Sequence, residues 1–137
     1  MNKVLFRFVV VLAGAVIFVI LFLLGPPILH LLSRFFPETT MPADMSWRVA
    51  VTITFVVINL IVYGALGWIV GHVRPSGGWT WGLWIAIFPA LAQIAIIFAF
   101  DVLYPLTAVA QISANIAGAV AGAHLGAGRT GGYEKSN

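Results

Sequence analysis

The sequence contains no cysteine and few charged residues. Without cysteine, disulfides, thiolate metal sites and thiol redox chemistry are excluded. Charged residues make up 8% of the 137 residues and apolar residues 61%, whereas roughly 25% of an ordinary soluble domain is charged. The mean hydropathy is +1.05. This composition excludes a water-soluble protein.

The charges that are present are too few and too scattered to form a nucleic-acid-binding surface. Seven basic and four acidic residues give a formal charge of +3, without the clustered Lys and Arg that bind phosphate backbones. The predicted spans also lack a carboxylate at mid-membrane depth, the group on which proton-coupled transport usually depends. We therefore expect neither a nucleic-acid partner nor energy-coupled transport.

Four apolar segments are long enough to cross a bilayer, which takes about 20 residues in a helix. Together they predict an all-α fold, a bundle of four transmembrane helices in one domain over residues 1–125, followed by a flexible cytoplasmic tail over 126–137. The first run is longer than the apolar core of a cleaved signal peptide, about 7–15 residues, so we expect it to be retained. The predicted spans cover residues 4–24, 47–73, 79–100 and 102–125.

A Gly-Pro-Pro sequence at residues 25–27 follows the first predicted span. Prolines interrupt helices because they lack an N–H group and crowd the preceding turn. The next residues alternate between apolar side chains and polar ones such as His30 and Arg34. This pattern predicts a separate, short amphipathic helix lying at the membrane interface.

The basic residues indicate the orientation of the chain, since Lys and Arg beside membrane spans stay on the cytoplasmic side. Arg34 and Arg48 fall on one side of the predicted spans. We expect the other side, with both termini, to be cytoplasmic, in a multi-pass protein of the plasma membrane, or of the inner membrane in a bacterium. That side carries Lys3, Arg7, Arg74, Arg129 and Lys135.

Four carboxamide side chains lie near the middle of three predicted spans. Hydrocarbon offers such groups no hydrogen-bond partner, so they are expected to turn toward one another inside the bundle. They act either as links between helices, or as the lining of a path for a polar solute or ion, or as a site for a lipid or quinone head group. The four residues are Asn59, Gln93, Gln111 and Asn115.

Glycines follow helical spacing on the second and fourth predicted spans. Small residues at this spacing allow the backbones of two membrane helices to approach closely. On the fourth span, the glycines share one face with the two carboxamides. We predict that these faces pack helices together, through Gly64, Gly67 and Gly71 on one span and Gly118 and Gly122 on the other.

Residue patterns typical of catalytic and cofactor sites are missing. The sequence has no His-Glu-x-x-His pattern and no phosphate-binding Gly-x-x-x-x-Gly-Lys motif. His72 and His124 fall at the predicted cytoplasmic end and His30 at the opposite end, where hydrogen bonds to lipid phosphates account for them better than haem or metal ligation. We therefore expect neither enzymatic activity nor a cofactor or bound metal.

These features favour a non-enzymatic role. The leading hypothesis is a small helix-packing or accessory subunit of a membrane complex, formed with further copies of itself or with a larger protein. The alternative is a passive channel or facilitator for a small polar solute or ion, lined by the carboxamides. A third possibility is a membrane anchor that binds haem or a quinone. The partners expected in every case are the lipid bilayer and a homo-oligomer or larger membrane-protein complex.

Overall fold

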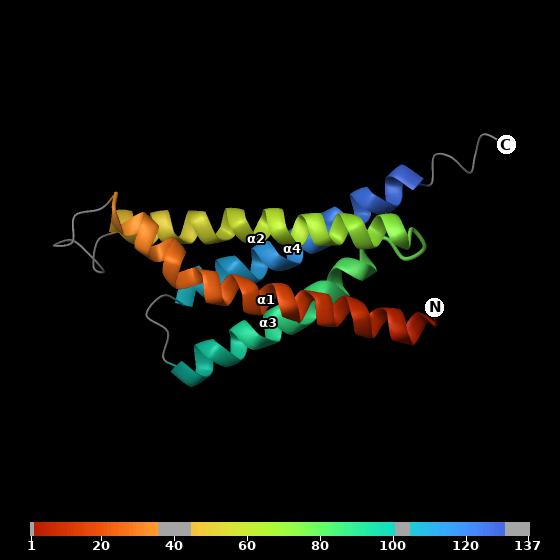
Figure 1. The fold of residues 1–137 in the computed structure, drawn as a ribbon, viewed down its shortest axis with the longest axis horizontal. Coiled ribbons are helices and arrows are strands. Elements are labelled where there is room, and N and C mark those ends of the chain that lie inside the picture. The colour runs from red at the N-terminus through yellow and green to blue at the C-terminus, as the bar shows by residue number, and fades with distance from the viewer. Residues whose placement is uncertain (1, 36–44, 101–104, 131–137) are drawn as a thin grey trace.

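The protein consists of four α-helices (Figure 1). A computed structural model describes residues 2–35, 45–100 and 105–130. Each helix is long and apolar enough to cross a membrane, which confirms the all-α prediction and its four apolar spans and favours a membrane location. The helices are α1 (Lys3–Ser33), α2 (Met45–Val73), α3 (Thr80–Phe100) and α4 (Pro105–Thr130).

The first helix is longer than predicted and includes residues 28–33, so the prediction that these residues form a separate interfacial helix is wrong. α1 runs through Pro26 and Pro27 without a break and ends at Ser33. Proline removes one hydrogen bond from a helix but keeps a helical φ angle, and membrane helices tolerate it when neighbouring groups compensate. The two prolines therefore bend α1 rather than end it, and Figure 1 shows its last turns swinging toward the start of α2.

The fourth helix also ends later than expected. α4 continues to Thr130, five residues past the predicted limit at Leu125. Gly126 is buried, and a Cβ atom there would meet the carbonyl oxygen of Trp68. Close packing against α2 therefore keeps this glycine-rich segment helical. The rest of the predicted tail, residues 131–137, lies outside the described residues.

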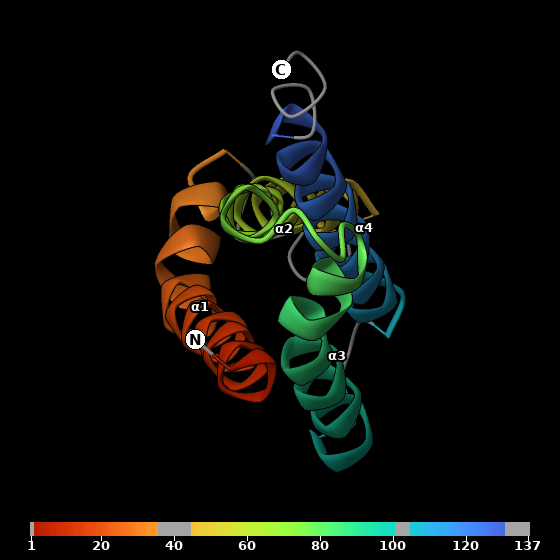
Figure 2. The same ribbon diagram turned by 90° about the vertical axis from the view of Figure 1, so that its right-hand side faces the viewer.

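α2 and α4 form the most extensive helix contact in the chain. A Cβ atom added to Gly67 or Gly71 would meet the carbonyl oxygen of Ala119 or Ala123, and one added to Gly122 would meet that of Gly64. Glycine is required at these positions because the two backbones touch. The helices lie side by side in Figures 1 and 2.

The other two helices attach to this pair in sequence. α3 packs on α4, where Gly82 meets the backbone of Val120, and α1 packs mainly on α3, where Gly14 meets the carbonyl of Ile85. Contact between α1 and α2 is slight. Viewed along the bundle, α1 stands apart from α4 (Figure 2).

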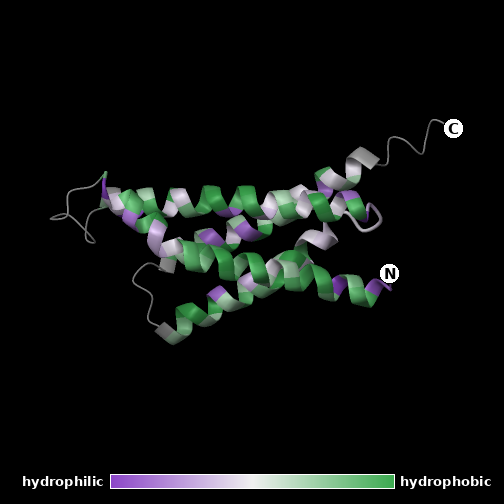
Figure 3. Cartoon of the chain, in the orientation of Figure 1, coloured by the Kyte–Doolittle hydropathy of each residue, from purple (hydrophilic) through white to green (hydrophobic). Residues whose placement is uncertain are grey.

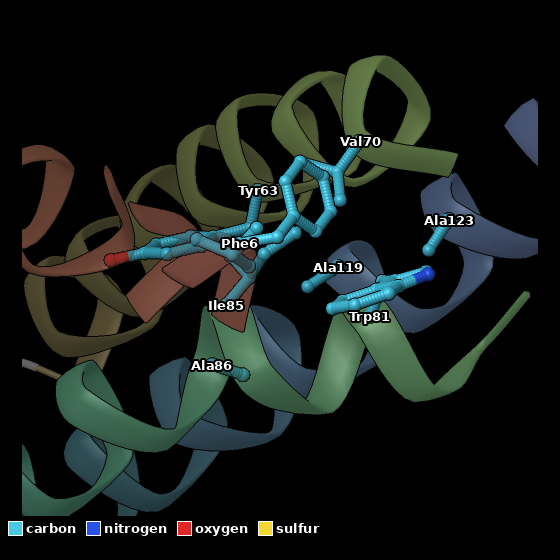
Figure 4. Packing of buried hydrophobic residues seen from close by; sticks show 9 residues of the cluster. Phe6, Tyr63, Val70, Trp81, Ile85, Ala86, Ala119 and Ala123 are labelled. Carbon is cyan, nitrogen blue, oxygen red and sulfur yellow. The ribbon is translucent and has the colours of Figure 1, made fainter. Parts of the chain in front are cut away.

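The buried core lies toward the end of the bundle that holds the N-terminus. The rings of Phe6 and Trp81 meet edge to face, with centroids 4.8 Å apart and planes at 87°. Tyr63 and Ile85 are completely buried beside them, and the Tyr63 hydroxyl points away from Trp81 (Figure 4). The complete cluster is Phe6, Val10, Tyr63, Val70, Trp81, Ile85, Ala86, Ala119 and Ala123.

Apolar residues predominate along the helices (Figure 3), and many of the large ones are exposed. Phe8 on α1 and Phe98 on α3 are 72% and 86% exposed. A water-soluble protein rarely exposes so many large apolar side chains. The surface is suited to contact with acyl chains.

Candidate functional site: an apolar pocket with carboxamides

A large cavity lies at the opposite end of the bundle from the core. Its volume is about 640 Å³, and all four helices contribute to its walls. The bend of α1 brings Gly25, Pro26 and Leu29 into the lining. The lining consists of Phe18, Leu21, Phe22, Gly25, Pro26 and Leu29 from α1, Trp47, Val51, Phe55 and Asn59 from α2, Gln93, Ile96 and Ile97 from α3, and Thr107, Ala108 and Gln111 from α4.

Three of the four carboxamides identified in the sequence form a hydrogen-bonded chain between α3 and α4. The Asn115 Nδ2 donates to Gln93 Oε1 at 3.3 Å, and the Gln93 Nε2 donates to Gln111 Oε1 at 3.5 Å. Both distances exceed the usual value of about 2.9–3.0 Å. Both bonds are therefore weaker than a hydrogen bond of ordinary length.

Asn59 belongs to the same region but not to the hydrogen-bonded chain. It is buried, and its Nδ2 donates to the carbonyl oxygen of Phe55, one turn earlier in α2, at 2.7 Å. Its side chain lines the pocket together with Gln93 and Gln111. The structure thus gathers the four carboxamides in the interior and presents three of them to the pocket.

A pair of hydroxyl groups adds to this polar region. Thr52 and Thr107 share a hydrogen bond of 2.7 Å between their Oγ1 atoms, which links α2 to α4. Thr107 also lines the pocket. It was not predicted as a site residue, although it precedes Gln111 by four residues and so continues the polar face of that helix.

Two buried polar atoms have no hydrogen-bond partner within the described part of the chain, the Tyr63 hydroxyl and the Asn115 Oδ1. Tyr63 follows Asn59 by four residues, so both lie on one face of α2. A buried polar group without a hydrogen bond lowers the stability of the folded state by about 1–3 kcal/mol. The interior next to the pocket therefore retains hydrogen-bonding capacity that the described residues do not use.

Among the described residues, the pocket ends at the packed core of the bundle. Beyond Asn59 and Gln93, toward the N-terminal end, Tyr63, Ile85 and Val10 are at most 2% exposed. The glycine contacts close the space between the backbones in the same region. In the described residues, the cavity is thus a blind pocket next to a packed core.

The five predicted packing glycines lie between α2 and α4 of one chain. Gly67, Gly71, Gly118 and Gly122 are buried, and Gly64 is half-buried. Their neighbours across the contact are backbone atoms of the same chain. This small-residue surface is consequently used within the monomer.

The histidines form no metal site in the described part of the chain, where no three potential metal-binding side chains gather. The His72 ring stacks on Trp68, with centroids 5.5 Å apart. Both side chains are exposed. This stacking is suited to a location near the membrane interface.

Comparisons with protein-family models, with curated proteins and with solved structures find no match for this chain. Its function is therefore inferred from the geometry and chemistry of its own residues.

Proposed function

We propose that this chain is a non-enzymatic membrane protein that binds an uncharged, largely apolar molecule with a hydrogen-bonding head group. The observation that supports this proposal is the cavity of about 640 Å³, which combines apolar walls with three carboxamides. Binding pockets for small molecules usually have about 300–1,000 Å³, mostly apolar walls and a few convergent polar groups. The pocket has all three properties.

The chemistry of the lining favours a neutral head group. A carboxamide both donates and accepts hydrogen bonds, so Gln93, Gln111 and Asn59 suit a carbonyl or hydroxyl oxygen. None of the described lining residues is charged. An ionised head group would be buried there without a counter-charge, at a large cost in free energy. A quinone or a neutral lipid has the required chemistry.

The aromatic and branched side chains of the pocket suit the remainder of such a molecule. Phe18, Phe22 and Phe55 contribute aromatic rings to the lining, and Ile96 and Ile97 contribute branched side chains from α3. Burial of apolar ligand surface against these groups contributes dispersion energy. The ligand would thus lie with its ring or chain among these residues and its oxygen near the carboxamides.

The accessory-subunit and channel roles remain predictions. Assembly with another chain would need surfaces other than the five glycines, because these pack within the monomer. Conduction through one chain would need an opening in the core around Tyr63 and Ile85, which are completely buried. Purification in mild detergent, followed by mass spectrometry of bound proteins, lipids and pigments, distinguishes the roles. A stoichiometric protein partner supports the accessory role.

The binding proposal is tested by filling the pocket from α4. Ala108 lines the pocket, whereas Ala117 on the same helix is exposed. We expect Ala108→Leu to weaken binding of decylubiquinone about tenfold or more, because the added atoms occupy ligand space. Ala117→Leu adds the same atoms on the outer surface and should bind like the unmodified protein.

Tryptophan fluorescence provides the measurement, since quinones quench nearby indole rings and Trp47 lines the pocket. Saturable quenching should weaken in Ala108→Leu and lose its main component in Trp47→Phe. Circular dichroism during heating checks that each variant remains folded. Equal saturable quenching in Ala108→Leu and Ala117→Leu would contradict the proposal. It would also be contradicted if the unmodified protein showed no saturable quenching and its organic extract contained no neutral amphiphile.

A further inference from the structure

A second cavity lies at the end of the bundle where α1 begins and α2 ends. Its volume is about 290 Å³. Lys3 and Arg7 reach it from α1 and Arg74 reaches it from the end of α2, so three positively charged side chains line one small space. The turn before α3 and the indole rings of Trp81 and Trp84 complete the walls.

Aromatic rings hold the two arginines in place. The Arg7 guanidinium carbon is 5.2 Å from the centroid of Trp84, and that of Arg74 is 4.9 Å from the centroid of Phe6. Such contacts use the flat face of a guanidinium, while its N–H groups point outward in its plane. Two arginines held in this way are preorganised for bidentate hydrogen bonds to phosphate.

The turn beneath the cavity is also well defined. Gly77 has a φ of 125°, and a Cβ atom there would be 2.8 Å from Trp81 Nε1. The same indole N–H donates to the carbonyl oxygen of Ser76 at 3.2 Å, and Thr80 Oγ1 donates to that of Gly77 at 2.7 Å. Glycine is required here both for the backbone conformation and for the approach of the indole ring.

The charge in this region points to an anionic ligand. Lys3, Arg7 and Arg74 bring three positive charges to the wall of one cavity of about 290 Å³. A phosphate bound among them would be attracted by all three charges at short range.

The surroundings favour a lipid over a free phosphate. Val4 and Phe8, each one residue beyond a basic residue of the cavity, are 69% and 72% exposed, and Trp79 is 53% exposed. Exposed apolar side chains next to basic residues are typical of membrane-surface sites for anionic lipids. A free phosphate would gain nothing from them.

We propose that Lys3, Arg7 and Arg74 form a binding site for the phosphate of an anionic lipid head group, with the acyl chains lying along the adjacent apolar surface. The site is separate from the carboxamide pocket and does not depend on the function proposed above. It would anchor this end of the bundle to a membrane leaflet rich in anionic lipid.

Native mass spectrometry of the detergent-solubilised protein tests the proposal with phosphatidylglycerol and phosphatidylcholine of identical acyl chains. We expect phosphatidylglycerol to bind about tenfold more tightly. The double variant Arg7→Gln/Arg74→Gln should lose this preference. The double variant Arg34→Gln/Arg48→Gln removes the same charge from the opposite end of the bundle and should keep it. Equal binding of the two lipids, or equal effects of the two double variants, would overturn the proposal.

Competition with inorganic phosphate separates the two sources of the ligand group. If a large excess leaves phosphatidylglycerol bound, the lipid is the ligand, as proposed. If it displaces the lipid completely, the site binds free phosphate and the proposed ligand is wrong. Should the arginine variant fail to fold, Lys3→Gln replaces it, since Lys3 is exposed in the first turn of α1. That variant should weaken binding of phosphatidylglycerol about threefold, and an unchanged affinity would overturn the proposal.

Discussion

At the scale of single residues, glycines contribute more to the helix contacts than carboxamides do. Hydrogen bonds between membrane helices average about 0.6 kcal/mol, and the two links through Gln93 are long. The glycines instead permit direct contact between backbones, as at Gly122 and Gly64. Dispersion contacts between closely packed helices are individually small but numerous. Disrupting one glycine contact should therefore lower the free energy of unfolding more than removing one hydrogen bond between carboxamides.

Gly122→Ala should destabilise the bundle, because the added methyl group meets the Gly64 carbonyl oxygen on the facing helix. Forcing one methyl group into a packed contact typically costs about 1–3 kcal/mol. Gly128→Ala is the matched control, since nothing lies within 4 Å of a Cβ atom there. Alanine stabilises a helix by about 1 kcal/mol relative to glycine. The Gly128→Ala variant should therefore be at least as stable as the unmodified protein.

Unfolding in a titration with sodium dodecyl sulfate, followed by circular dichroism, measures the free energy of unfolding of both variants. The free energy of unfolding should be lower for Gly122→Ala than for the unmodified protein. For Gly128→Ala it should be equal or higher. If both alanine variants show the same stability, the backbones of α2 and α4 do not pack as closely as the structure indicates.

At the scale of the helices, the proline pair determines the shape of α1. Alanine at Pro26 and Pro27 would restore two N–H groups, which would donate to the carbonyl oxygens of Phe22 and Leu23. Helix kinks of about 20° or more usually occur at residues such as proline, and a kink of about 20° is taken for α1. Over the last turns of α1, at 1.5 Å per residue, straightening should move the helix end by about 3 Å.

Spin labels can measure this movement, because the absence of cysteine allows labels at chosen positions only. Leu31 and Ile53 are 56% and 57% exposed and lie on α1 beyond the bend and on α2. Their separation should increase in the double alanine variant. A second pair at Leu12 and Ile61, located before the bend, should keep its distance. An unchanged separation for both pairs would show that packing, not proline, bends the helix.

Long apolar segments made the four spans predictable, but the helix ends were less so. The wrong prediction at residues 25–27 treated proline as a helix terminator, whereas its fixed φ also fits a helix interior. At Gly126 the tertiary contact with Trp68 outweighs the low helix propensity of glycine. Both differences arise where packing between helices, which a single sequence does not specify, decides the local structure.

At the scale of the whole molecule, the bundle has a packed end and a hollow end. Gly14 against Ile85 brings α1 and α3 together near the core. Farther along, Phe18 of α1 and Ile97 of α3 both line the pocket. Carboxamides in hydrocarbon must be turned inward, so their position in the interior was predictable from the sequence. The pocket was not, because its apolar lining residues resemble lipid-facing residues in sequence and its shape depends on how α1 bends and crosses α3.

The arrangement of the four helices also predicts which parts of the chain share a side of the membrane. Asn2 and Gly128 are exposed near the ends of the chain, and Phe35 is 77% exposed just beyond α1. Figure 1 shows the start of α1 and the end of α4 at the same end of the bundle, opposite the end of α1. Single cysteines at positions 2 and 128 should therefore react with an impermeant maleimide from one side of sealed vesicles, and a cysteine at position 35 from the other.

The excess of Lys and Arg near the chain ends predicts that the side shared by positions 2 and 128 is cytoplasmic, so inside-out vesicles should label these two and right-side-out vesicles should label position 35. Labelling after detergent treatment serves as the control, since all three cysteines should then react. Reaction of positions 2 and 128 from opposite sides would require an odd number of crossings. Reaction of positions 2 and 35 from the same side would mean that α1, despite its 31 residues, does not cross the bilayer.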